Sequence, residues 1–92
     1  MKIVVRARVE DDLDRIFAWI EKDNPHAAAN MIRRIRDRIG RLALSSLAEM
    51  GRRGREAGTR ELVEGPYIIV YEVYRHRDEV HILAVFHGAR NR

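Results

Sequence analysis

Two runs of β-branched and aromatic residues near the end of the chain restrict the fold more than any other feature. The first covers Tyr67–Tyr74 and the second residues 80–87, with the polar segment 75–79 between them. This pattern predicts two antiparallel strands joined as a hairpin with a longer loop. A Gly-Pro pair at residues 65–66 precedes the first run. Because proline fixes φ and donates no N–H, the first strand is expected to begin just after this pair. The second strand is expected to end at Gly88.

Both faces of this hairpin are apolar. In the first strand, alternation separates Tyr67, Ile69, Tyr71 and Val73 from Ile68, Val70, Glu72 and Tyr74. In the second, it separates Val80, Ile82, Ala84 and Phe86 from His81, Leu83, Val85 and His87. If helices cover only one face, the other is a larger apolar surface than a monomer usually exposes. We therefore expect a partner to cover it.

The N-terminal half has the pattern of one short strand followed by two amphipathic helices. Residues 2–6 are rich in β-branched side chains between charged flanks, which predicts an edge strand. Apolar residues then recur at helical spacing from residue 9 to residue 22. A second helix is predicted to begin at Pro25 with Asn24 as its N-cap. The break between the helices is short, so they must form an antiparallel pair that packs on a flat apolar surface.

The segment 45–58 contains three glycines and no apolar period, which predicts a loop. Residues 59–63 predict a short strand that turns at residues 64–66 into the hairpin. The expected order is therefore β-α-α-β-β-β, an α+β fold in which an antiparallel sheet has the N-terminal helical hairpin packed on one face. The first strand is expected at one edge. A single domain, residues 1–92, is predicted, and its core must be thin because the chain is short.

Composition restricts the partners. The formal net charge is +4, and every basic residue except Lys2 and Lys22 is arginine. Arginine is suited to planar contacts with carboxylate or phosphate, so an acidic protein or a nucleic acid is the expected kind of partner. The chain has neither a membrane-length apolar run nor a signal sequence, which predicts a cytoplasmic protein without membrane contact.

Two groups of arginines could bind phosphate, but each has a simpler structural interpretation. One group lies on the predicted second helix, where Asp37 stands four residues from both Arg33 and Arg41. That spacing is typical of ordinary surface pairs. The other group surrounds two glycines in the loop, without the glycine spacing of a nucleotide-binding motif. A charged helix face and a solvated loop are therefore favoured.

The polar chemistry of the chain is limited to arginine, tyrosine and histidine at strand ends. There is no cysteine and no histidine spacing typical of a metal site, so no metal or other cofactor is expected. Neither serine stands in a nucleophile motif. Metal-free RNA cleavage could use arginine to offset charge and histidine or tyrosine to move protons. The candidates for that role are Arg60, Tyr67, Tyr71, His87 and Arg90. Packing is the competing interpretation of both tyrosines, and Arg60 could pair with Glu61 or Glu72.

Three stretches together resemble a known family. They are Thr59–Val63 (TRELV), Gly65–Tyr71 (GPYIIVY) and Ile82–Arg90 (ILAVFHGAR). With Asp12, Leu13 and Ile16 in the first helix, they are similar to the ParE branch of the RelE/ParE toxin superfamily of bacterial toxin–antitoxin modules. The resemblance implies a β-α-α-β-β-β fold. It also implies a cognate antitoxin whose C-terminal segment wraps the toxin and through which alone the complex contacts DNA.

The resemblance implies two alternative activities. ParE members inhibit DNA gyrase, whereas RelE relatives cut mRNA on the ribosome. Cleaving members carry a basic or tyrosine side chain next to the position of His87, and here the neighbour is Gly88. The sequence therefore favours a gyrase-binding toxin whose target surface includes Arg60, Tyr67, His87, Arg90 and Arg92. The alternatives are a ribosome-dependent endoribonuclease using Arg60, His87 and Arg90, and an inactive toxin.

Overall fold

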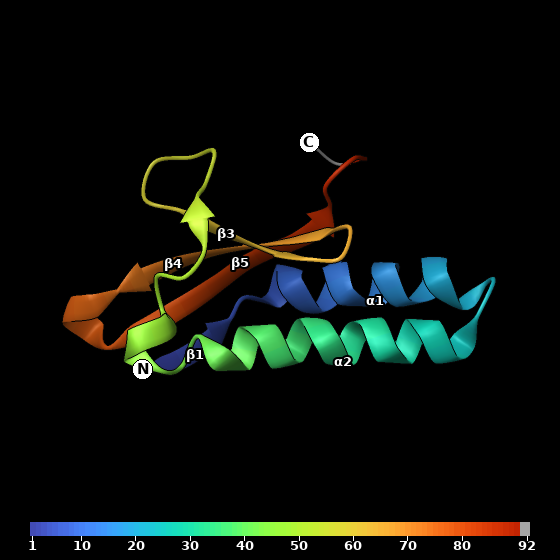
Figure 1. Cartoon of the computed structure of the whole chain (residues 1–92), viewed down its shortest axis with the longest axis horizontal. Coiled ribbons are helices and arrows are strands. Elements are labelled where there is room, and N and C mark those ends of the chain that lie inside the picture. Colours follow the sequence, from blue (N-terminus) through green and yellow to red (C-terminus); the bar gives the residue numbers. More distant parts are fainter. Residues whose placement is uncertain (91–92) are drawn as a thin grey trace.

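The computed structural model describes residues 1–90 and has two layers, a mixed five-stranded sheet and a pair of helices. Both helices lie on the same side of the sheet (Figure 1). The sheet order is β1-β5-β4-β3-β2. The elements are β1 (Lys2–Val5), α1 (Ala7–Glu21), α2 (Pro25–Arg41), β2 (Arg52–Arg53), β3 (Arg60–Glu64), β4 (Tyr67–Tyr74) and β5 (Glu79–His87). The predicted α+β class, the helical hairpin and the C-terminal meander are confirmed.

The two helices form an antiparallel pair whose apolar stripes face the sheet. The Asn24 side chain accepts a hydrogen bond from the Ala27 N–H at 3.1 Å, which satisfies a free N–H of the first turn of α2. Leu13 of α1 and Ile35 of α2 are buried beside Ile82 of β5 in one core cluster. Neither helix has the length and apolar character needed to cross a membrane within residues 1–90.

A bulge in the hairpin changes which side chains of β5 face the helices. Tyr71 pairs with Ile82, but the next pair is Val70 with Ala84, so β5 contains one extra residue. The predicted uniform alternation of residues 80–87 is therefore wrong beyond the bulge. Val85 is buried in the core, and His87 lies opposite Tyr67 on the helix-facing side. The bulge thus turns the last histidine of the strand toward α1.

Two further details of the sheet differ from the expectation. β1 pairs with β5 in parallel, so the sheet is mixed. Two helices and three strands lie between β1 and β5 in the sequence. The predicted loop 45–58 contains the short strand β2, whose Arg52 is opposite Glu61 of β3. Adjacent arginines have no β-forming pattern, and the pairing depends on the partner strand.

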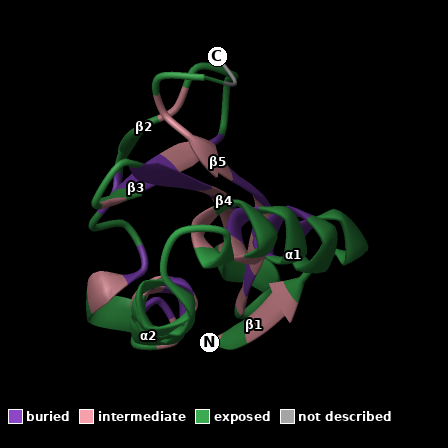
Figure 2. Cartoon of the chain, turned by 90° about the vertical axis from the view of Figure 1, so that its right-hand side faces the viewer, coloured by how far each residue is buried: buried purple, intermediate pink, exposed green. Residues whose placement is uncertain are grey.

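The sheet face away from the helices is apolar but only partly exposed (Figure 2). Val63 is 45% exposed, whereas Ile68 is 6% exposed. The C-terminal turn covers Ile68 so closely that a Cβ added to Gly88 would lie 3.0 Å from its Cδ1 atom. Val70 and Phe86 on the same face are half-buried. Apolar residues therefore lie on the outer face, but Glu61 and Glu72 share it and Val63 is the large apolar residue exposed there, so the face is smaller and less apolar than the sequence predicted.

Candidate functional site

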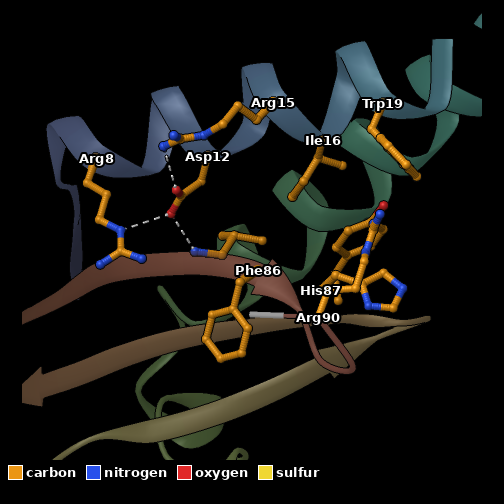
Figure 3. Close-up of a pocket in the computed structure, with 10 residues that line it drawn as sticks. Arg8, Asp12, Arg15, Ile16, Trp19, Phe86, His87 and Arg90 are labelled. Carbon is orange, nitrogen blue, oxygen red and sulfur yellow. Dashed lines mark hydrogen bonds and ion pairs between the residues drawn. The ribbon is translucent and has the colours of Figure 1, made fainter. Parts of the chain in front are cut away.

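A cavity of about 500 Å³ opens between α1 and the end of β5 (Figure 3). Both walls carry cationic and aromatic groups, and Ile16 and Val85 provide apolar surface, whereas the Phe86 ring points away from α1. Three of the residues predicted to form the target surface, Tyr67, His87 and Arg90, line it together. The bulge in β5 is the reason that His87 reaches this side of the sheet.

His87 is held in place by two neighbours. Its ring meets the Tyr67 ring edge-on, with the ring centroids 5.5 Å apart. Its Nδ1 atom accepts a hydrogen bond from the Ala89 N–H at 3.1 Å. In the neutral imidazole the proton is therefore assigned to Nε2, which makes that nitrogen a donor. Tyr67 itself is only 3% exposed, so it acts by supporting His87 rather than by direct contact with a large partner.

Trp19 on α1 forms the other wall and was not among the predicted site residues. It is 55% exposed, and the guanidinium of Arg90 lies 4.5 Å from its ring centroid. The amine of Lys22 lies 5.1 Å from the same ring. Its position in the sequence carried a signal, because Trp19 stands outside the apolar stripe of its helix. A large aromatic residue on a polar helix face is a frequent component of interfaces.

Trp19 also lines a second cavity, of about 560 Å³. The second cavity is lined by the same Trp19, Tyr67, His87 and Arg90, with Met31 and Pro66 on its far side. The two hollows therefore form one surface centred on the aromatic and cationic side chains. We call this surface, defined by Trp19, Tyr67, His87 and Arg90, the C-terminal site.

Positive charge exceeds negative charge around the first cavity. Asp12 lies 3.4 Å from both Arg8 and Arg15, so a single carboxylate faces two guanidiniums. Both arginine side chains are mostly exposed. With Arg90 nearby, the cavity suits an anionic group such as a carboxylate or a phosphate.

Arg60 is separated from the C-terminal site. It pairs with Tyr71 in the sheet, whereas Tyr67 pairs with His87. Four strand residues correspond to about 13 Å along β4. Its guanidinium donates to the Gly51 carbonyl at 2.9 Å and lies 3.6 Å from Glu49. The structure thus brings Tyr67, His87 and Arg90 together and places Arg60 elsewhere, while Arg92 lies outside the described residues.

Arg60 instead lines a third cavity, of about 600 Å³, beside the loop that precedes β3. Arg53 and Arg55 also line this cavity, so it is basic. Glu49 also lines the cavity and its negative charge offsets part of the positive charge. A hydrogen bond from Arg75 at 2.6 Å is the main reason that the pKa of Glu49 is lowered. This cavity has the charge to accept a phosphate, but within residues 1–90 no histidine or tyrosine lines it to move a proton.

Tyr71 is fully buried and has a structural role. Its hydroxyl accepts a hydrogen bond from the Gly51 N–H at 2.9 Å. Burial raises the pKa of the phenol above its ordinary value, so the hydroxyl stays protonated at neutral pH. A cleaved substrate would have no access to it.

Replacing Tyr71 with phenylalanine is expected to lower the free energy of unfolding by about 1–3 kcal/mol, because the buried Gly51 N–H loses its acceptor. Urea unfolding would measure this change, with Tyr74→Phe as the control on the half-buried part of the same strand. Growth arrest by the induced Tyr71→Phe variant should stay close to that of the parent. A lost arrest with unchanged stability would instead indicate a catalytic role for the hydroxyl.

The arginines of α2 contribute to ion pairs between elements. Arg36 lies 2.8 Å from Glu10 of α1, and the pKa of Glu10 is lowered mainly by this hydrogen bond. Arg34 and Arg38 both contact Glu64 at the end of β3. These contacts support the interpretation of α2 as a charged surface helix. No cluster of three or more histidine or acidic side chains that could hold a metal ion occurs in residues 1–90.

Comparison with known proteins identifies the family. Residues 3–92 match the model described as the ParE toxin of the type II toxin–antitoxin system parDE. The chain belongs to the ParE toxin family. The resemblance inferred from the sequence is thereby confirmed.

Two relatives are similar to this chain in sequence, and two solved structures share its fold. The chain is 47% identical over 78 residues to the toxin Y4kP of Sinorhizobium fredii, covering 83% of this chain and 76% of that protein. It is 32% identical to toxin RelE1 of Caulobacter vibrioides, covering 98% and 96%. A chain of the chromosomal ParDE system from P. aeruginosa has the same fold, with a TM-score of 0.81, 21% identity and 95% of each chain covered. A chain of the RelBE2 complex from Mycobacterium tuberculosis gives 0.60 at 20% identity, with 94% and 95% covered.

Proposed function

We propose that this ParE-family chain arrests growth by binding DNA gyrase through the C-terminal site, without catalysis of its own. The observation that carries the proposal is the match to the ParE toxin family over residues 3–92. The site is consistent with protein binding, since an exposed Trp19 and the Arg90 beside it are residue types that often dominate interface energies. Tyr67 and His87, whose rings pack edge-on, lie beside these two side chains in the same cavity.

The separation of Arg60 from the other candidates argues against RNA cleavage. A metal-free nuclease needs a charge-stabilising group and a proton-transfer group within hydrogen-bonding reach of the same phosphate. Arg60 is engaged with Gly51 and Glu49, while His87 is offset from it by about 13 Å along the strand direction and lies two strands away. Gly88 supplies no additional side chain beside His87.

A second candidate function is ribosome-dependent mRNA cleavage through Arg60, His87 and Arg90. The similarity to toxin RelE1 of Caulobacter vibrioides over 98% of this chain favours it. The basic cavity around Arg60 would then bind the RNA backbone, with His87 or Arg90 contacting a different part of the ribosomal complex.

Two assays on the purified full chain separate these functions. We expect supercoiling by gyrase to be inhibited in a dose-dependent manner, and primer extension on translated mRNA to show no new ends. A His87→Ala, Arg90→Ala double variant serves as the control in both assays. Unchanged supercoiling together with new mRNA ends would favour the nuclease. Induction without any growth defect would instead indicate an inactive toxin.

We also propose that a cognate antitoxin binds and neutralises this chain in the cytoplasm. The net charge of +4 and the partly exposed apolar outer face suit an acidic, amphipathic segment. Contact with DNA would occur only through the antitoxin, and no contact with a membrane is proposed. Neither a metal nor another cofactor has a part in this function.

A further inference from the structure

Asp12 is a buried acid whose hydrogen bond joins two distant parts of the chain. Its residue exposure is 7%, and its Oδ2 atom accepts the Val85 N–H at 3.0 Å. The bond links the middle of α1 to the end of β5, 73 residues later in the sequence. A buried carboxylate is stabilised only when it is hydrogen-bonded or paired, and Asp12 is both.

The bond replaces a missing strand. β1 pairs with β5 only from Glu79 to Ile82, and the last backbone contact of this edge is the Arg6 N–H to the Ile82 carbonyl at 3.2 Å. Beyond it the chain enters α1, so Val85 has no strand partner on that side. The carboxylate of Asp12 supplies the acceptor that a longer β1 would have provided.

The early end of β1 leaves room for the cavity. A longer strand would lie along β5 as far as His87 and occupy the space between β5 and α1. The single side chain of Asp12 accepts the Val85 N–H without filling that space. The cavity therefore exists because the edge of β5 is capped by Asp12 rather than by a strand.

The Asp12 bond also connects the two elements that carry the walls of the C-terminal site. Trp19 lies seven residues further along α1, which corresponds to about 10 Å of helix. His87 lies two residues beyond Val85 on β5. Because the bond joins the two elements near the floor of the cavity, it limits how far Trp19 can move from Arg90 and His87.

We propose that Asp12 is a positioning residue of the C-terminal site. It fixes the end of β5 against α1 through the Val85 N–H and so holds the aromatic and cationic walls at their working separation. It makes no contact with the target itself. The inference goes beyond the proposed function and relies on it only in assuming that the C-terminal site contacts the target, whichever target that is.

The test compares Asp12→Ala with Asp12→Asn in the full chain, with Asp11→Ala on the exposed side of the same helix as the matched control. Asparagine keeps an oxygen that can accept the Val85 N–H but removes the charge that faces Arg8 and Arg15. Three quantities are measured: hydrogen exchange of the Val85 amide, the emission of the single tryptophan, and the amount of induced protein needed for growth arrest.

For Asp12→Ala we expect exchange of the Val85 amide to accelerate by about tenfold or more, the Trp19 emission to shift, and the arresting dose to rise by about tenfold. For Asp12→Asn we expect the Val85 exchange rate and the arresting dose to stay within about threefold of the parent, and the Trp19 emission to stay close to that of the parent. The reason is that the Val85 amide keeps an acceptor. Asp11→Ala should match the parent in each measurement. This rescue by asparagine separates a positional role from a role of the charge.

Either of two results would overturn the proposal: full arrest by Asp12→Ala at the parental dose, or an Asp12→Asn variant as impaired as Asp12→Ala. If Asp12→Ala does not fold, Asp12→Asn decides alone. For Asp12→Asn, a protected Val85 amide with retained arrest supports the proposal, whereas a protected amide with lost arrest, or an unprotected amide with retained arrest, contradicts it. A parent chain that arrests growth without inhibiting gyrase would refute the proposed target and leave this comparison intact.

Discussion

The His87→Ala, Arg90→Ala double variant is expected to need about tenfold or more protein for growth arrest, because it removes the cation and the ring that form one wall of the C-terminal site. Arg90 covers the exposed Trp19 at 4.5 Å, and His87 packs edge-on against Tyr67. The cost in stability is expected to be about 1–2 kcal/mol, mostly from the lost aromatic pair. Induction titrations would measure the dose, and urea unfolding the stability.

Arg77→Ala is the matched control for this variant. It also removes one exposed guanidinium that lies over an aromatic ring, that of Tyr74, but at the opposite end of the hairpin. Its arresting dose should equal that of the parent. If the double variant remains as toxic as the parent, the target surface lies elsewhere, and the outer face of the helical hairpin becomes the next candidate.

Local patterns in the sequence were sufficient for most of the fold. The Asn24–Pro25 helix start and the strand after Gly65-Pro66 depend on backbone properties of neighbouring residues, so they can be recognised without knowledge of the tertiary structure. β2 could not be recognised in this way. Its Arg52 is held opposite Glu61 of β3, and that pairing exists only when the sheet has formed.

The composition of the site was harder to predict, for a reason of register. One extra residue in β5 determines that His87 joins Tyr67 on the helix-facing side, and no local signal in a uniformly apolar strand reveals a bulge. The separate pairing of β3 with β4 places Arg60 opposite Tyr71, far from His87. A sequence pattern can show that a residue lies near a strand end, but the end of the sheet at which it lies depends on long-range pairing.

Asp12 shows the same limit from another direction. Among four acidic residues at the start of the first helix, at positions 10, 11, 12 and 14, the sequence indicated only a favourable charge for a helix N-terminus. Asp12 alone is buried, because it faces the unpaired edge of β5. A polar residue next to the apolar Leu13 at the start of the stripe was the available signal, and it could not name Val85 as the partner.

Binding of the antitoxin is expected to raise the apparent free energy of unfolding of this chain by about 4 kcal/mol when free antitoxin is present at about 1,000 times its Kd. This increase is a substantial fraction of the free energy of unfolding of a small domain, which is about 5–15 kcal/mol. No cysteine is available to strengthen the core, and Val63 on the outer face remains 45% exposed. A partner that covers this face adds the apolar contacts that the two helices cannot provide.

The antitoxin segment should be acidic, disordered when free, and folded against the toxin when bound. Charge attraction is expected to act mostly on the encounter, so added salt should slow association more than it accelerates dissociation.

Co-expression with the neighbouring reading frame and purification through a tag on the toxin would test whether the complex forms. Thermal unfolding of the complex beside the free chain would measure the gain in stability. An exposed arginine of the toxin contributes to this attraction. Arg8→Ala should therefore lower the association rate constant for the antitoxin without an equal change in the dissociation rate constant. A free toxin that is monomeric and stable, with no small protein co-purifying, would contradict both the role of the apolar face and the proposed antitoxin.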